Sequence, residues 1–259
     1  MVLNLAYKKN EVTKKDIVLV TIMGVWIALL KIVYVVLVFL VFLIPDRKIG
    51  EKKKCICFKV GLTFIAVIAN LIWLKIGAGY FAEVPAGVNV GKQVKFVLTH
   101  PLHYIVILLR TVVHLCGSWI SCMIGSHMGA FCIDISPIVW VGFLVLFFYI
   151  TIKCQEVSMK VRKCDIIILL FVFLSGALLV CTSEYVQWTA YASAIIDGVQ
   201  GRYFTPIIMF PMLAFVLVNG KKERKNKNGN GYVLYGKYFY ILVLALNGIG
   251  ILDIIHYYL

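Results

Sequence analysis

The densest group of polar residues outside the basic segments lies between residues 183 and 206. Its second half reads Asp-Gly-Val-Gln-Gly-Arg-Tyr-Phe-Thr-Pro, from Asp197 to Pro206. Gly198 and Gly201 allow the backbone to come close to a ligand. The guanidinium of Arg202 is a planar fork of donors that suits a phosphate or a carboxylate, and a helix beginning just after it would also favour an anion. These residues indicate a site for an anionic lipid or a sugar-phosphate headgroup.

The candidate binding residues are two acids, an amide, an arginine and a tyrosine: Glu184, Asp197, Gln200, Arg202 and Tyr203. Flat apolar surfaces come from four nearby aromatic residues, Tyr185, Trp188, Tyr191 and Phe204. A structural role is the alternative. In that interpretation the aromatic residues form a belt at the membrane surface, and Arg202 pairs with Asp197 or Glu184 as a clamp.

Other residues give weaker indications of chemistry. Of four histidines that could suggest a metal site, only His100 and His103 are close in sequence, and Pro101 between them hinders a regular helical pair. We therefore predict no metal site, and no cofactor is evident. Lys31 could bind a phosphate, although a lysine at a turn can also simply extend its charge to the membrane surface. No catalytic residue is assigned.

The composition shows what kind of fold must position these residues. Hydrophobic residues make up 62%, charged residues only 15%, and the mean hydropathy is +0.94. Because a soluble domain has roughly 25% charged residues, a soluble fold is excluded. The apolar residues form long runs without the alternation of barrel strands. We predict an all-α fold, a polytopic bundle of transmembrane helices in a single domain over residues 1–259.

The basic residues indicate the orientation of that bundle. Most lysines and arginines fall in four clusters beside apolar runs, within 8–15, 47–59, 153–163 and 221–237. Such clusters normally stay on the cytoplasmic side. We therefore attribute the net charge of +14 to topology and anionic lipid headgroups, and we predict no nucleic-acid partner. The expected location is the plasma membrane of a bacterial cell, with the basic loops cytoplasmic.

Keeping all four clusters on one side predicts about seven spans, near 17–30, 32–44, 60–76, 137–152, 165–183, 204–218 and 238–255. The first two would form a hairpin that turns at Lys31; one long tilted helix is the alternative. Residues 77–100 and 183–203 would be external loops, and Lys221–Gly231 a flexible one. Residues 101–123 are amphipathic and are expected to lie along the interface or re-enter the membrane. A helix facing a cavity of the bundle stays open as another interpretation.

Three segments resemble one known family. Asp197–Pro206 resembles the "QGRYF-x-P" signature of the bacterial membrane proteins called domain of unknown function 2142. Lys31, followed by an apolar run that ends at Pro45, is similar to that family's "K…P" hairpin. Gln93–Pro101, with the apolar stretch that ends in Gly125-x-x-x-Gly129, is similar to its middle section. The resemblance covers nearly the whole chain, which looks like the C-terminal portion of the family.

That family resembles multispanning glycosyltransferases that use polyprenyl-phosphate sugars on the external membrane face. The resemblance implies a role in cell-envelope glycan assembly, a polyprenyl-phosphate sugar as donor, and a site lined by Gln200, Arg202 and Tyr203. The family's acidic "DE…H" motif has no counterpart here, so we expect a truncated product or half of a split enzyme with a partner encoded upstream. Two alternatives stay open: a lipid or solute carrier with Arg110 facing a cavity, and a non-catalytic partner subunit.

Overall fold

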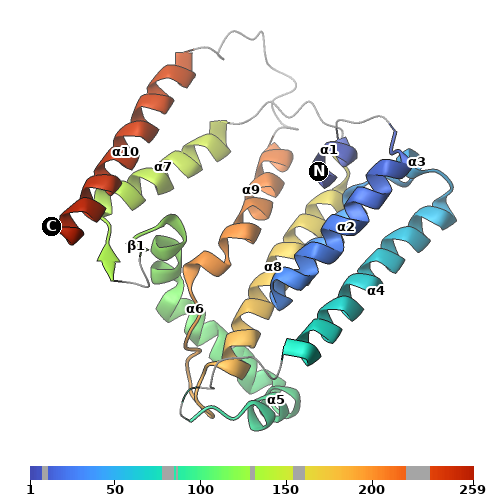
Figure 1. Cartoon of the computed structure of the whole chain (residues 1–259), viewed down its shortest axis with the longest axis horizontal. Coiled ribbons are helices and arrows are strands. Elements are labelled where there is room, and N and C mark those ends of the chain that lie inside the picture. Colours follow the sequence, from blue (N-terminus) through green and yellow to red (C-terminus); the bar gives the residue numbers. More distant parts are fainter. Residues whose placement is uncertain (8–10, 78–84, 86, 129–131, 154–160, 220–233) are drawn as a thin grey trace.

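The computed structural model describes residues 1–7, 11–77, 85, 87–128, 132–153, 161–219 and 234–259 (Figure 1). These residues are mostly helical, which confirms the predicted helical fold. One short antiparallel ladder pairs β1 (His127–Met128) with β2 (Ile133–Asp134). The helices are α1 (Val2–Tyr7), α2 (Lys14–Leu30), η1 (Ile32–Leu43), α3 (Asp46–Ile49), α4 (Lys52–Gly77), α5 (Val90–Thr99), α6 (Pro101–Ile124), α7 (Pro137–Lys153), α8 (Lys163–Gln187), η2 (Gly201–Tyr203), α9 (Thr205–Asn219) and α10 (Leu234–Tyr258).

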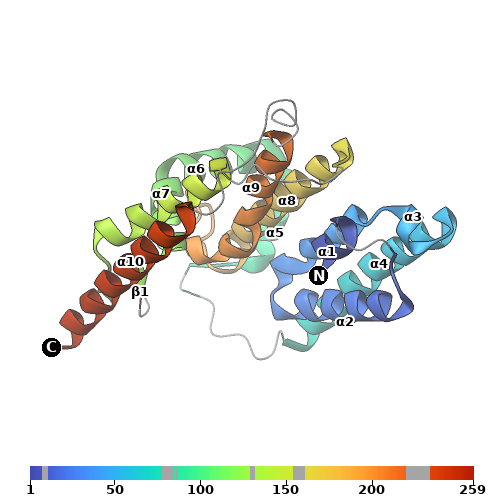
Figure 2. The same cartoon turned by 90° about the horizontal axis from the view of Figure 1, so that it is seen from above.

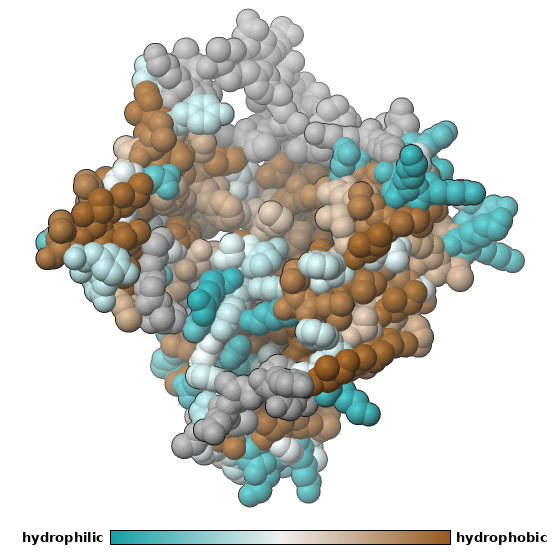
Figure 3. All heavy atoms as spheres, in the orientation of Figure 1, coloured by the Kyte–Doolittle hydropathy of each residue, from teal (hydrophilic) through white to brown (hydrophobic). Residues whose placement is uncertain are grey.

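Several helices have the length and apolarity to cross a membrane. Among the described residues, four do: α4, α6, α8 and α10 over Tyr238–Tyr258. Three shorter apolar helices accompany them, Ile32–Leu43, Pro137–Ile152 and Thr205–Val218. Hydrophobic atoms cover α2, α4 and α10, while hydrophilic atoms gather around α3 and around α5 (Figure 3). This distribution fits a chain surrounded by lipid between two polar ends.

The first two apolar runs form α2 and η1, which pack against each other. Thr13 and Asp16 form a capping box that starts α2, and Lys31 has an extended backbone that ends it. Because η1 is a 3₁₀-helix, its 12 residues rise by about 2.0 Å each and reach about 24 Å. The 17 residues of α2 reach about 25 Å at 1.5 Å each. Helices α2 and η1 are therefore about equal in length.

The 3₁₀ form of η1 suits its position between two cores. A 3₁₀-helix has three residues per turn, so side chains three positions apart share one face. One row, with Val38, Val41 and Ile44, packs into the core shared with α2 and α4. Another row, beginning with Val33 and Val36, packs into the larger core with α8 and α9. The helix type was not predicted, because a run without polar residues has no period to read.

Helix α6 differs from its neighbours in direction. It lies across the direction of α4 and α8, while α2 lies beside α4 and α7 beside α10 (Figures 1 and 2). Its buried residues are Tyr104, Ile107 and Thr111, whereas Leu102 and Val113 are 78% and 75% exposed. Helix α6 is also apolar and long enough to cross a membrane. Its position relative to the membrane therefore stays a prediction.

The observed helices correct the expected loops. Residues 77–100 were expected to be an external loop, yet Val90–Thr99 form α5, whose start is capped by the side chain of Asn89 accepting from the Lys92 N–H. Helix α8 continues to Gln187, so Glu184 lies on a helix and not in the expected loop 183–203. The expected flexible segment Lys221–Gly231 lies outside the described residues.

Where η1 ends and α4 and α8 begin, basic side chains are tightly bonded; we call this the basic end, defined by Asp46, Lys59, Arg162 and Asp165. Arg162 donates to the buried carboxylate of Asp165 at 2.6 Å and to the Leu43 carbonyl at 2.7 Å. Lys59 donates to Asp46 at 2.7 Å and to the Ile44 carbonyl at 2.6 Å. These bonds satisfy carbonyl groups that a helix end leaves without partners.

Candidate functional site

The predicted binding residues lie at the opposite end of the fold from the basic end. Helix α2 runs from Lys14 to Leu30, and η1 returns from there to Leu43 at the basic end. Helix α8 likewise begins at the basic end and carries Glu184 in its last turn. Lys31, Glu184, Arg202 and Tyr203 together define what we call the site end.

The segment that carries Asp197, Gln200, Arg202 and Tyr203 joins α8 to α9 and is fixed by side-chain bonds to its backbone. Thr189 Oγ1 donates to the Glu184 carbonyl at 3.1 Å and accepts from the Asp197 N–H at 3.0 Å. Thr111 Oγ1 on α6 accepts from the Ile196 N–H at 3.0 Å. The loop therefore has a defined position relative to both α8 and α6.

Gly201 brings η2 into direct contact with the backbone of α6. A Cβ atom at this position would lie 2.0 Å from the carbonyl oxygen of Trp119 and 2.6 Å from the nitrogen of Met123. Such distances are impossible for a real side chain, and both neighbours are backbone atoms that cannot move aside. Only glycine allows this approach, which sets the position of Arg202 and Tyr203.

Tyr203 is contacted by cations from both halves of the chain. The Nζ atom of Lys31 lies 3.2 Å from the centre of the Tyr203 ring, a close cation–π contact. The guanidinium carbon of Arg202 lies 5.7 Å from the same ring centre. Tyr34 Oη donates to the Tyr203 carbonyl at 3.3 Å. The hairpin turn of α2 and η1 is therefore joined to the predicted Gln-Gly-Arg-Tyr segment.

Electrostatics connect three charged groups at this place. Burial lowers the pKa of Lys31; the carboxylate of Glu184 opposes this shift, and the charge of Arg202 adds to it. Arg202 itself is exposed, and Glu184 is half-buried. Within the described residues neither Arg202 nor Glu184 forms an ion pair, so the clamp of Arg202 with Asp197 or Glu184 is absent there. Two cations and one carboxylate leave a net positive charge.

The five predicted residues take different positions. Glu184, Arg202 and Tyr203 lie near Lys31. The side chain of Asp197 is exposed, and its backbone groups bond to Thr189. Gln200 starts η2, and its Oε1 atom is buried without a hydrogen-bond partner in the described part of the chain.

Two further polar side chains lie at this end: Tyr185, which was predicted only as an apolar surface, and Gln93, which was not among the predicted binding residues. Tyr185 and Gln93 are fully buried, yet Tyr185 Oη and both amide atoms of Gln93 have no partner among the described residues. An unsatisfied buried polar group costs about 1–3 kcal/mol. Gln93 lies on α5, in a segment that was interpreted as a loop, so no sequence signal placed it here. Lys31 had a signal, as the one charged residue between Asp16 and Asp46.

Comparison with known protein families identifies the family of this chain. Residues 1–211 match the model of a family described as predicted membrane protein (DUF2142). The chain belongs to this family. The DUF2142 match contains Lys31 and all five predicted binding residues, and it ends within α9. No curated protein and no solved structure matches the chain.

Two histidines of this DUF2142 protein, His100 and His103, pack against the same Phe96 ring, whereas His127 lies on the short β1–β2 ladder. His100 stacks on Phe96 with ring centres 5.3 Å apart, and His127 Nε2 lies 3.3 Å from Asp134 Oδ1 across the β1–β2 ladder. Among the residues that the structure describes, no group of three or more His, Cys, Asp or Glu side chains could hold a metal ion. At the site end the charged groups are the cations Lys31 and Arg202 and the carboxylate of Glu184.

Proposed function

We propose that this membrane protein binds a polyprenyl-phosphate sugar at the site end and acts as a glycosyltransferase-like protein of the bacterial cell envelope. One observation carries the proposal: Lys31 and Arg202, from distant segments, both contact Tyr203 without an ion-pair partner in the described residues. A phosphate group would supply the missing negative charge. The apolar helices beside the site would accept the polyprenyl chain.

The proposed reaction assigns a role to each charged group. Lys31 and Arg202 hold the phosphate that leaves, which takes the electron pair of the broken bond between phosphate oxygen and sugar carbon. The oxygen of an acceptor hydroxyl forms the new bond to that carbon. Its proton passes to the carboxylate of Glu184, which acts as general base. Gln200 and the ring of Tyr203 line the sugar side.

The proposal requires the site end to be external and the basic end cytoplasmic, as the clusters of lysine and arginine indicate. Cysteines introduced at two exposed positions, Ala190 and Lys53, provide the test. In intact cells a membrane-impermeant thiol reagent should label the cysteine at 190 and not the one at 53. The opposite pattern would place the candidate site in the cytoplasm and overturn the proposed donor access.

Binding of the lipid phosphate is tested directly with Arg202→Ala. Loss of one charge-assisted contact should weaken binding of undecaprenyl phosphate by about 10- to 100-fold in nanodiscs. Arg110→Ala is the matched control, because Arg110 is also exposed but lies on α6. Undecaprenol, which lacks the phosphate, should bind equally to all three proteins. Equal affinities of Arg202→Ala and the unaltered chain for undecaprenyl phosphate would overturn the proposal.

Transfer is separated from binding with a radiolabelled polyprenyl-phosphate sugar. An active enzyme should release polyprenyl phosphate in the presence of an acceptor glycan, and Glu184→Gln should stop release while leaving binding intact. Binding without release would instead favour the carrier or the non-catalytic subunit. Release that appears only after an upstream-encoded chain is added would favour a split enzyme.

A further inference from the structure

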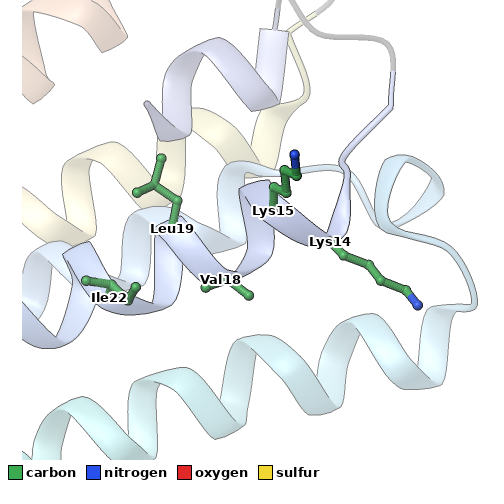
Figure 4. Close-up of a pocket in the computed structure, with 5 residues that line it drawn as sticks. All are labelled: Lys14, Lys15, Val18, Leu19 and Ile22. Atoms are coloured by element: carbon green, nitrogen blue, oxygen red, sulfur yellow. The ribbon is translucent and has the colours of Figure 1, made fainter.

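Two groups of polar side chains outside the site end differ in their arrangement. On α2, Lys14 and Lys15 extend to different sides of an open apolar surface and do not converge on one point (Figure 4). After α6, by contrast, the side chains of Cys122 and Asp134 both approach the imidazole ring of His127. Cysteine, histidine and aspartate can act as a nucleophile, its base and the group that orients the base. This second group is therefore a candidate for covalent chemistry.

The imidazole ring of His127 has a different partner at each nitrogen. Its Nε2 atom lies 3.3 Å from Asp134 Oδ1, and its Nδ1 atom lies 3.6 Å from Cys122 Sγ. In the neutral ring one nitrogen carries the hydrogen and the other carries a lone pair, and the hydrogen bond at the first sets which is which. When the carboxylate accepts the Nε2–H, Nδ1 carries the lone pair. That tautomer allows Nδ1 to take the proton of the Cys122 thiol.

The local backbone brings these three residues together. Gly125 ends α6 in the left-handed conformation, with a φ of 101°, and the chain turns there into β1. In the antiparallel ladder of β1 and β2, His127 is the register partner of Asp134. Cys122 lies in the last turn of α6, directly before this turn of the chain. The helix end and the ladder therefore place thiol, imidazole and carboxylate in a row.

Accessibility distinguishes two candidate nucleophiles beside this ring. Ser126 Oγ lies 2.7 Å from His127 Nδ1, closer than the thiol does, but Ser126 is only 4% exposed. Cys122 is half-buried, so a substrate can reach its sulfur. The Ser126 hydroxyl also donates to Cys122 Sγ at 3.8 Å, and such a bond favours negative charge on the sulfur. Cys122 is therefore the nucleophile, and Ser126 supports its thiolate form, which is the reactive one.

The β1–β2 hairpin lies where apolar helices begin and end. Helix α7 begins at Pro137, shortly after β2, and the Ser136 N–H donates to the Asp253 carboxylate near the end of α10 at 2.8 Å. Helix α10 is apolar and long enough to cross a membrane. For a helix that crosses, this end lies at the headgroup region, next to the ester carbonyl groups of phospholipids. That position brings the Cys122 thiol to the level of lipid acyl esters.

We propose that Cys122 is a nucleophile that takes up a fatty acyl group from an ester or thioester at the membrane surface. His127 Nδ1 removes the thiol proton, and the sulfur forms a bond to the acyl carbonyl carbon. The bond from that carbon to the oxygen or sulfur of the donor breaks, and the leaving atom takes the electron pair and the proton from His127. The products are a thioester on Cys122 and an alcohol or thiol. Asp134 is a positioning residue, since it holds the ring in the tautomer that accepts the proton.

The test offers the full chain two acyl donors separately. Nanodiscs of ester-linked phosphatidylglycerol supply an ester, and nanodiscs of ether-linked lipid with added palmitoyl coenzyme A supply a thioester. Mass spectrometry of peptides should find one acyl group on Cys122 with at least one donor, and the donor that reacts identifies the source. Neutral hydroxylamine should remove the group, because it cleaves thioesters. Cys116→Ala is the matched control and should still be acylated, since Cys116 also lies on α6 and is more exposed than Cys122.

The variants separate chemistry from accessibility. His127→Ala should slow acylation by about 100-fold, the usual contribution of a general base, and added imidazole should restore part of the rate. Asp134→Asn should slow acylation by about 10-fold, from the loss of one hydrogen bond to the ring, while Asp134→Glu should keep most of the rate. An acyl group on Cys116 at an equal rate, a hydroxylamine-resistant ester on Ser126, an unchanged rate in His127→Ala, or no acylation by either donor would each overturn the proposal.

Discussion

At the basic end, Arg162 and Lys59 each bond to a carboxylate and to a backbone carbonyl at the end of η1. At the site end, Lys31 and Arg202 contact the ring of Tyr203. Both places gather two cations around one end of the same hairpin. The difference is that the charges of the basic end neutralise one another, whereas those of the site end leave a positive excess.

This comparison distinguishes a structural cluster from the proposed binding site. A cation whose charge is neutralised by a bonded carboxylate can hold helices together but attracts a further anion only weakly. A cation that rests on an aromatic ring keeps donors for a phosphate. Substitutions at the basic end should therefore lower stability, and substitutions at the site end should lower ligand affinity.

The largest expected effect is that of Asp165→Ala at the basic end. Asp165 is 1% exposed, and its loss would leave Arg162 without its carboxylate. Breaking a buried pair costs about 3–5 kcal/mol of folding stability. Because Arg162 is partly exposed, we expect the free energy of unfolding to fall by about 3 kcal/mol. Unfolding by denaturing detergent measures it. Lys54→Ala, which breaks the exposed pair with Glu51, should change stability by less than about 0.5 kcal/mol. Equal effects of the two variants would show that the basic end is not a structural cluster.

Gly201→Ala at the site end should affect both stability and binding. The added Cβ would collide with the backbone of Trp119, at a cost of about 2 kcal/mol, and would displace Arg202 and Tyr203. Gly248→Ala on α10 is the control, because a Cβ there meets no atom within 4 Å. The melting temperature and the affinity for undecaprenyl phosphate should both fall in Gly201→Ala and stay unchanged in Gly248→Ala. Unchanged affinity in Gly201→Ala would show that binding does not depend on the position of η2.

The smallest expected effect is a dependence of folding stability on pH, which arises from Asp46 at the basic end. The hydrogen bond from Lys59 lowers the pKa of Asp46, and the bond from Cys55 adds to this. The unfolded chain then takes up a proton at higher pH than the folded chain. Stability from Asp46 is therefore complete above its unfolded pKa and is lost as the pH falls through the lowered folded pKa.

Asp46→Asn tests this sign. Its melting temperature should fall less between pH 7 and pH 3 than that of the unaltered chain. Glu51→Gln, at an exposed acid, should follow the unaltered chain. Parallel curves for Asp46→Asn and the unaltered chain would contradict the role of the Lys59 bond.

The apolar runs and basic clusters predicted a helical membrane protein, because lipid allows few other backbones and charge asymmetry follows the membrane. The signature around Arg202 lies in the segment whose Tyr203 contacts Lys31, and its role in binding stays a prediction. The contact of Lys31 with Tyr203 could not be predicted, since it joins distant segments through packing. Helix α5 was missed because Pro85, Gly87 and Gly91 suggested a loop, although Asn89 is a good N-cap residue.

The pitch of η1 links the two ends mechanically. Arg162 and Lys59 anchor its last carbonyls, while its first residue follows directly on Lys31. Twelve residues rewound from a 3₁₀-helix into an α-helix would shorten by about 6 Å. Since one end is anchored, the whole displacement would appear at Lys31 and draw its ammonium group away from the tyrosine ring. Spin labels near residues 31 and 203 would report such rewinding as a change in the distance between them.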